Sequence, residues 1–366
     1  MDYDVVIVGA GPSGAAAART LVNGGLNVLI IERKKLPRAK MCSGLINDKS
    51  LKLTRELFGE IPESAYARPE LLKAVRLWHT KEDFTDWPLN ENSEGAPNIW
   101  RSKYDEWLVK SSGAVIKDCC TLLSLEQHNN PLSPTRSHAQ RGNEKGGMGG
   151  ISLHCKNEQG KTVKFKGTYL IGADGSKSTV RAAIDPEFEK GLGWLVAIQQ
   201  YCEGTSTLDA HYFNGFLDPK FSEVYAWFNM KDDLLIFGTA VKRGSKFEPY
   251  FLEFKRFLED NFELRAKKVV MQESCIGNNM ASSGNFHLGK GNVLLVGEGA
   301  GFLNMFGEGI SSALATGKLA GEAILEGIKT KKDALSIYTA SSRNEKVETF
   351  GSWKLAARIA GRRVME

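Results

Sequence analysis

The chain has 366 residues, 42% of them hydrophobic and 25% charged, and it carries a formal net charge of +5. This composition is typical of a globular protein of about two domains, and the mild charge gives no sign of a nucleic-acid partner. No apolar stretch is long enough to span a bilayer, and the first apolar run enters a glycine turn without the basic segment of a signal peptide. Six cysteines without C-x-x-C spacing predict neither a metal site nor a disulfide framework, so we expect reduced thiols in the cytoplasm.

The start of the chain predicts a strand–helix–strand unit. Residues 5–8 and 26–31 are short apolar runs typical of buried parallel strands. Between them, glycines in G-x-G-x-x-G spacing open an alanine-rich helix whose N-terminal N–H groups favour a phosphate. The acid that ends the second strand can bind ribose hydroxyls, so FAD or NAD is expected rather than NADP. The candidate cofactor residues are Gly9, Gly11, Pro12, Ser13, Gly14, Glu32 and Arg33.

A polar segment, residues 34–46, follows and turns to small residues around Cys42. A cysteine in such a loop, just beyond a dinucleotide fingerprint, lies either near a cofactor ring or in a purely structural position. The residues alone favour neither reading.

Arg101 stands in front of the next strong helical pattern, residues 104–112, for which Ser102 is the expected N-cap. Its guanidinium either clamps a phosphate or a flavin edge, or is a solvated charge at the helix start. Before this helix, we expect another helix over residues 48–60 and strands over residues 71–80 and 84–88.

Residues 128–150 combine Pro, Gly, Ser, Asn and charges with almost no aliphatic side chains, and predict a flexible loop inserted in a hairpin. Strands are expected over residues 151–155, 162–165 and 169–171. A second strand–turn–helix follows, in which Asp174 and Gly175 precede a helix opened by Ser178. Asp174 either belongs to an anion-binding turn or caps the helix.

A second sheet is predicted from strands over residues 193–201, 210–213, 224–230 and 234–241. In an extended strand, Tyr225 and Trp227 share one face, while Val224, Ala226 and Phe228 share the other. The Tyr–Trp face either lines an apolar cavity or belongs to the core. An amphipathic helix is expected over residues 250–264.

A third glycine turn follows the strand expected at residues 292–296, in the segment GEGAGFLNMFGEGI. It leads into a helix from about Ile310 that is rich in Ala and Gly, which indicates close approach of its backbone to a helix or a cofactor. The basic segment of residues 350–364 is either an interfacial helix or a docked C-terminal helix.

The three glycine turns together resemble the FAD-binding fold of the aromatic-hydroxylase type of flavoproteins. Within that fold, KMCSGLI and the Tyr225-Ala226-Trp227 segment resemble the geranylgeranyl reductase family of FAD-dependent oxidoreductases. The resemblance implies an α/β (α+β) fold: a Rossmann-like FAD-binding domain with an inserted substrate domain on an antiparallel β-sheet, plus C-terminal helices. We assign residues 1–75, 96–184 and 275–325 to the FAD-binding domain, 76–95 and 185–274 to the substrate domain, and 326–366 to the C-terminal segment.

The resemblance also implies roles for individual residues. Beyond the first turn, the expected cofactor contacts are Cys42, Arg101, Asp174, Gly175, Gly297, Glu298, Gly307, Gly309 and Ile310. Cys42, Tyr225 and Trp227 are the expected catalytic and substrate-facing residues. The chain departs from the family pattern in having Glu298 where Asp is usual. It also lacks the prolines that usually flank the aromatic motif, where Ser222 and Met230 stand, and the proline before Gly307.

The function implied is that of an FAD-dependent oxidoreductase that reduces or oxidises carbon–carbon bonds of an apolar, prenyl-type substrate by hydride transfer at flavin N5. The alternatives are an FAD monooxygenase that hydroxylates an aromatic metabolite through a flavin hydroperoxide, and a flavin-binding protein without turnover. The electron donor is external, such as NAD(P)H or a reduced carrier, because the chain has no second dinucleotide motif. The expected partner is a small apolar or aromatic molecule, with contact to a membrane surface and the oligomeric state left open.

Overall fold

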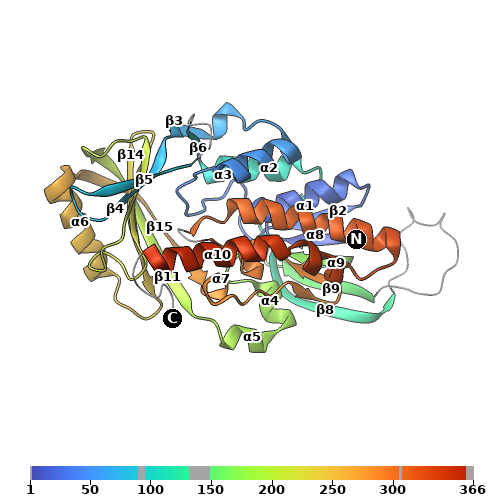
Figure 1. Ribbon diagram of the computed structural model, residues 1–366. Coiled ribbons are helices and arrows are strands. Elements are labelled where there is room, and N and C mark those ends of the chain that lie inside the picture. The colour runs from blue at the N-terminus through green and yellow to red at the C-terminus, as the bar shows by residue number, and fades with distance from the viewer. Residues whose placement is uncertain (1, 90–94, 132–148, 305–306, 360–366) are drawn as a thin grey trace.

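The computed structural model describes residues 2–89, 95–131, 149–304 and 307–359, and contains two large sheets side by side (Figure 1). The first sheet has the strand order β16-β17-β10-β1-β2-β7, with β9 and β8 added beside β10. Its inner strands β17, β10, β1, β2 and β7 are parallel. The bounds are β1 Asp2–Val8, β2 Val28–Ile31, β7 Val115–Lys117, β8 Thr121–Pro131, β9 Gly149–Lys156, β10 Thr162–Gly172, β16 Gly289–Lys290 and β17 Val293–Leu295.

Two helices pack together against this parallel sheet, α1 (Pro12–Asn23) and α8 (Ile310–Thr330) (Figure 1). The small residues of α8 face α1: a Cβ on Gly317 would lie 2.2 Å from the carbonyl oxygen of Ser13, and one on Gly321 would lie 2.8 Å from Thr20 Cβ. The close approach predicted from the glycine and alanine content of α8 is therefore to a neighbouring helix.

The second sheet has the order β15-β11-β14-β13-β12-β4-β5 and is antiparallel except where β12 meets β4. Helix α6 (Glu248–Phe262) covers one face with Phe251, Phe254, Leu258 and Phe262, as its amphipathic pattern predicts. The opposite face of the second sheet is turned toward the first sheet and its glycine turns. The bounds are β4 Ala74–Trp78, β5 Phe84–Pro88, β11 Trp194–Thr205, β12 Tyr212–Phe216, β13 Ala226–Lys231, β14 Leu234–Lys242 and β15 Arg265–Asn278.

The remaining elements connect the two sheets or cover their edges. A small sheet pairs β3 (Tyr66–Leu72) with β6 (Ala96–Ile99). The other helices are α2 Asp48–Phe58, α3 Arg101–Ser111, α4 Thr179–Ile184, α5 Pro186–Lys190, α7 Met280–Ser283, α9 Ala334–Ser341 and α10 Arg343–Ile359, with 3₁₀ turns η1 Glu63–Ala65 and η3 Gly297–Ala300. No helix in the described ranges has the length and apolar character needed to cross a membrane. The expected fold class is confirmed.

Several local expectations are corrected. Ser102 is not an N-cap, because α3 already begins at Arg101 after Trp100. Residues 162–165 and 169–171 form one strand, since β10 continues through Gly167 and pairs with β1 along its second half. Val224 was expected on the face opposite Tyr225, but both residues pack in the same apolar cluster with Trp227. The reason is that β13, and with it the strict alternation of faces, begins only at Ala226.

The C-terminal helix docks on the protein. Its residue Trp353 is buried and donates a hydrogen bond from Nε1 to the carbonyl of Leu303 at 2.6 Å. Helix α10 also begins at Arg343, well before the expected residue 350. The loop expected over residues 128–150 joins the paired strands β8 and β9, and residues 132–148 of it lie outside the described part. The division into domains stays a prediction; α8 runs through its boundary at residue 325.

Candidate functional site

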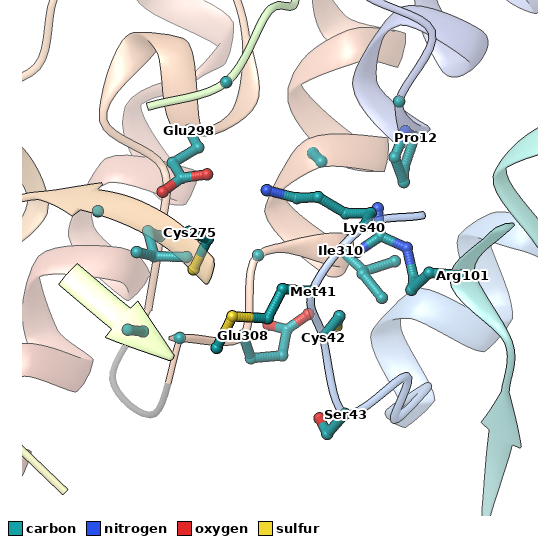
Figure 2. Close-up of a pocket in the computed structure, with 18 of the residues that line it drawn as sticks. Pro12, Lys40, Met41, Cys42, Ser43, Arg101, Cys275, Glu298, Glu308 and Ile310 are labelled. Carbon is teal, nitrogen blue, oxygen red and sulfur yellow. The ribbon is translucent and has the colours of Figure 1, made fainter. Parts of the chain in front are cut away.

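A cavity of about 620 Å³ lies between the two sheets. It opens at the carboxyl ends of β1 and β10, where open parallel sheets bind their ligands, and it extends along the face of the second sheet opposite α6. Figure 2 shows the part of its wall that contains Pro12, Arg101, Cys42 and Glu298. Its wall contains most of the residues expected from the sequence: Gly9, Gly11, Pro12, Ser13, Glu32, Arg33, Cys42, Arg101, Asp174, Gly175, Tyr225, Trp227, Glu298, Gly307, Gly309 and Ile310. Tertiary folding thus gathers side chains from across the chain into one site, while their individual roles stay predictions.

Gly14 and Gly297 are the two expected cofactor residues that do not line this cavity. A Cβ on Gly14 would lie 2.1 Å from the carbonyl oxygen of Gly9, so this glycine permits the turn to close onto α1. Gly297 has a φ of +57° and lies against Ser13. Both glycines shape the site through backbone packing.

The N-terminus of α1 faces the cavity without a side-chain cap. Gly11 is the N-cap residue in an extended conformation, and no side chain accepts from the first turn. Pro12 has no N–H, so the amide groups that follow it remain available to an anion. A Cβ on Gly11 would lie 3.5 Å from Arg38 Nη2, whereas a Cβ on Gly9 would lie 2.2 Å from the carbonyl oxygen of Ala173. The turn is therefore tightly packed against Ala173 at Gly9 and has free space at Gly11, as a pyrophosphate cradle requires.

Glu32 is buried at this turn and holds a cation beside it. Its carboxylate accepts from the N–H of Ala10 at 3.1 Å and of Lys34 at 3.0 Å, and from Arg38 Nε at 3.2 Å. Arg38 also donates to the carbonyl of Ala10 at 3.2 Å. Arg38 is not among the residues expected from the sequence. The signal available was a basic residue in the loop just beyond the fingerprint, which is where a phosphate would need a counter-charge.

Arg101 is buried, so the interpretation as a solvated charge is wrong. It forms a bidentate pair with Asp105, from Nε to Oδ1 at 2.8 Å and from Nη2 to Oδ2 at 2.9 Å, and it hydrogen-bonds Cys42. Burial acts to lower the pKa of Arg101, but Asp105 and Cys42 outweigh it and hold that pKa above its ordinary value. Arg38 Nη2 lies 3.4 Å from Asp105, which joins both arginines in one buried charge cluster.

Cys42 lies in the loop between β2 and α2, which is fastened to β6. Ile99 donates from N–H to the carbonyl of Gly44 at 2.8 Å, and Ile46 donates to the carbonyl of Pro97 at 3.0 Å. The N–H of Gly44 donates to Cys42 Sγ at 3.3 Å. The thiol is therefore held at the cavity wall between a backbone donor and the guanidinium of Arg101.

Asp174 lines the cavity and caps α4. Its carboxylate accepts from the N–H of Thr179 at 2.6 Å, the N–H of Val180 at 3.2 Å and the hydroxyl of Ser178 at 2.6 Å. Burial raises the pKa of Asp174, and these hydrogen bonds oppose the rise. The helix-capping interpretation is confirmed by these contacts, and a cofactor contact by the same residue stays a prediction.

The N-terminus of α8 contributes Gly307, Gly309 and Ile310 to the wall. Glu308, which was not expected from the sequence, accepts from Ser311 N–H at 2.8 Å, Ser311 Oγ at 2.7 Å and Asn304 Nδ2 at 2.7 Å.

In Figure 2 the amine of Lys40 points across the cavity toward Glu298. The Lys40 amine and the Glu298 carboxylate therefore face one another at the cavity wall.

The far end of the cavity is an apolar chamber on the second sheet. It is formed by Met41, Leu45, Val75, Leu89, Ala197, Phe213, Val224, Tyr225, Trp227 and Ala240. The rings of Tyr225 and Trp227 are 5.5 Å apart, and burial raises the pKa of Tyr225 above its ordinary value. Burial likewise raises the pKa of Cys275, a neighbouring wall residue, to about 11.

The described residues fit FAD. Uncapped amide groups at α1 and the cation of Arg38 lie together at one end of the cavity, so a pyrophosphate would meet positive charge there.

Known proteins show the same architecture. The family model described as FAD binding domain matches residues 2–253. Protein CbrA of Escherichia coli O9:H4 (strain HS) is 26% identical over 357 residues, which is 95% of this chain and 88% of that protein.

Two solved structures illustrate the shared fold. A geranylgeranyl bacteriochlorophyll reductase-like protein from Thermoplasma acidophilum superposes with a TM-score of 0.77 at 18% identity, covering 100% of this chain and 88% of that one. Aklavinone-11 hydroxylase, in a complex with FAD and aklavinone, has a TM-score of 0.70 at 16% identity and covers 99% and 70%. This chain belongs to the FAD binding domain family and is an FAD-dependent flavoenzyme.

Proposed function

We propose that the protein reduces a carbon–carbon double bond of a neutral, apolar substrate of the prenyl type. One observation carries this proposal: the second sheet contributes no charged side chain to the cavity wall within the described residues. All of the charged wall residues belong to the half with the glycine turns. A substrate that fills the apolar chamber therefore gains by burying hydrocarbon and finds no partner there for a charge.

The cavity is continuous from the phosphate-binding turn to the apolar chamber, so one space can hold a bound ring system and a substrate together. When bound and reduced, FAD supplies the hydride, and an external donor such as NAD(P)H or a reduced carrier restores it. Arg38 and the α1 N-terminus hold the phosphates. The rings of Tyr225 and Trp227 hold the substrate and exclude water.

Reduction of a double bond also consumes a proton. Cys42 Sγ is the proton-bearing wall group that lies between Arg101 and the N–H of Gly44. We assign the proton to this thiol because of its place at the cavity wall, in contact with Arg101 and with the N–H of Gly44. Similarity to the geranylgeranyl bacteriochlorophyll reductase-like structure supports the substrate class.

A second candidate function is hydroxylation of an aromatic metabolite. It is favoured by the aromatic wall of Phe213, Tyr225 and Trp227 and by the similarity to aklavinone-11 hydroxylase. Both functions use the same cavity and differ in whether molecular oxygen or the substrate receives the electrons.

The deciding experiment reduces the FAD-loaded protein without oxygen and divides it in two. One portion receives geranylgeraniol under nitrogen, and the other receives air together with an aromatic polyketide. Oxidation of the flavin with a saturated prenol as product supports the reductase. A hydroxylated product that forms only in air supports the hydroxylase and overturns the proposal.

A further inference from the structure

Trp227 belongs to a row of residues that crosses four strands of the second sheet. Trp227 on β13 pairs with Gly238 on β14, Gly238 pairs with Gln199 on β11, and Gln199 pairs with Glu273 on β15. Directly paired residues point to the same face of a sheet. The row therefore lies on the cavity face, and it brings together residues that are far apart in the sequence.

A chain of hydrogen bonds follows this row. Trp227 Nε1 donates to Gln199 Oε1 at 3.1 Å. Gln199 Nε2 donates to Tyr201 Oη at 2.6 Å and to Glu273 Oε2 at 3.4 Å, and Tyr201 Oη donates to the same Glu273 oxygen at 2.6 Å. Gln199 is buried and lines the cavity, whereas Glu273 lies toward the surface at the edge strand.

This chain determines the orientation of the Gln199 amide. The Glu273 carboxylate only accepts hydrogen bonds when ionised, so the amide must turn its NH₂ group toward Glu273 and its oxygen toward Trp227. A bond to a charged group is stronger than one between neutral groups. The indole N–H therefore finds an acceptor in a fixed place.

Packing holds the indole ring at the same position. A Cβ on Gly238 would lie 2.5 Å from Trp227 Cζ2, so the ring occupies the space that a side chain at position 238 would fill. The ring is fixed by glycine below it and by Gln199 at its edge. The apolar contacts of the chamber alone would supply neither of these two constraints on the ring.

We propose that Gln199, held by Glu273 and Tyr201, is a positioning residue that sets the indole of Trp227 as the wall of the apolar chamber. The statement about substrate rests on the proposed function, whereas the positioning of the ring does not. Loss of the Gln199 amide leaves a buried indole N–H without its acceptor, and the ring then turns toward other partners.

The test compares Gln199→Leu with Gln200→Leu in the FAD-loaded protein. Gln200 is a matched control, because it lies on the same strand, points to the α6 side of the sheet and bonds its own partner Gln272 at 3.0 Å. We expect Gln199→Leu to change the tryptophan emission and near-ultraviolet circular dichroism, and Gln200→Leu to leave both as in the wild type. In a Trp227→Phe background the effect of Gln199→Leu should vanish.

Substitutions at Glu273 provide the conservative rescue. Glu273→Gln keeps an oxygen that can accept from both Tyr201 and Gln199, so its tryptophan spectra should match the wild type. Glu273→Leu removes that oxygen and should reproduce the spectra of Gln199→Leu. The proposal is overturned if the spectra of Gln199→Leu equal those of the wild type. It is also overturned if Gln199→Leu causes the same spectral change in the Trp227→Phe background.

Geranylgeraniol, titrated without oxygen and followed by the absorbance of bound FAD, tests the role in the chamber. We expect Gln199→Leu to weaken its binding about tenfold, as loss of one buried hydrogen bond to an oriented ring predicts, with Gln200→Leu unchanged. If the wild type itself binds no geranylgeraniol, the proposed function fails while the spectra still decide the positioning. If Gln199→Leu and Gln200→Leu both bind geranylgeraniol like the wild type, Gln199 has no role in the chamber. That result overturns the part of the proposal that concerns the substrate.

Discussion

Lys231 Nζ donates a hydrogen bond to the main-chain carbonyl of Ile99, with only 1% of the lysine exposed. Its ammonium also lies 5.0 Å from the ring centre of Trp100, and no carboxylate among the described residues forms an ion pair with it. Burial lowers the pKa of Lys231 to about 8, and Arg101 adds to the effect, while Cys42, Asp232 and Glu273 oppose it. A charge whose burial is unfavourable therefore lies against Gly44, in the loop that carries Cys42.

This charge predicts a gain of stability at alkaline pH. Below pH 8 the amine is protonated in the folded and unfolded chains, and its burial reduces the free energy of unfolding. Between pH 8 and its ordinary value of 10.5 the unfolded chain binds the extra proton, so the free energy of unfolding rises with pH. The contribution is of the order of 3 kcal/mol. Urea unfolding at several pH values should show this rise in the wild type and lose it in Lys231→Met.

Lys268→Met is the control for this prediction, since Lys268 is exposed on β15. Its unfolding curves should follow the wild type at every pH. A Lys231→Met protein with an unchanged pH dependence would mean that the buried amine does not titrate in this range.

Gly11→Val should abolish retention of FAD without unfolding the protein. The new side chain has room at the turn, with Arg38 Nη2 at 3.5 Å as its first contact, but it projects into the path of the pyrophosphate. We expect FAD affinity to fall by at least roughly tenfold, measured by flavin absorbance after gel filtration. Gly351→Val is the matched control, because nothing lies within 4 Å of a Cβ at that exposed position. Full retention of FAD by Gly11→Val would refute the cradle assignment.

Arg101→Met should be strongly destabilising. It leaves the carboxylate of Asp105 buried, with Arg38 at 3.4 Å as its remaining ion-pair partner in the described part of the chain. Breaking a buried pair from one side costs about 3–5 kcal/mol, measurable by urea unfolding. The double variant Arg101→Met, Asp105→Leu should regain part of this loss, because no unpaired charge remains.

The exposed pair of Arg55 and Glu60 provides the comparison for Arg101. Arg55→Met should change the free energy of unfolding by less than about 1 kcal/mol. Equal costs for the two substitutions would contradict the argument from burial.

Trp227→Phe should impair turnover and leave FAD bound. The substitution removes the bond to Gln199 and part of the chamber wall, so kcat/KM toward an apolar substrate should fall about tenfold. Trp78→Phe is the matched control: Trp78 donates from Nε1 to Asn214 at 2.9 Å but packs on the α6 side of the same sheet. We expect it to reduce stability with kcat/KM unchanged. If both variants have wild-type kinetics, Trp227 belongs to the structural core.

The elements whose formation depends on neighbouring residues could be predicted from the chain alone. The glycine spacing of residues 9–14, the apolar runs on either side and the acid at Glu32 identify a dinucleotide site, because turn geometry and strand burial depend on neighbouring residues. The helix α6 was predictable for the same reason, since its phenylalanines repeat with the period of one turn. Ser102 and Val224 were misassigned where an element begins one or two residues away from the expected position.

Which side chains become partners depends on how distant segments of the chain pack together. Arg38 reaches Glu32 and Asp105, Gln199 reaches Trp227, and Lys231 reaches Ile99 across separate elements. No periodicity in the chain reports such pairs, because each depends on the register of strands joined through distant segments. The local pattern therefore identifies the cofactor, whereas packing between the two sheets determines the charges and hydrogen bonds that shape its surroundings.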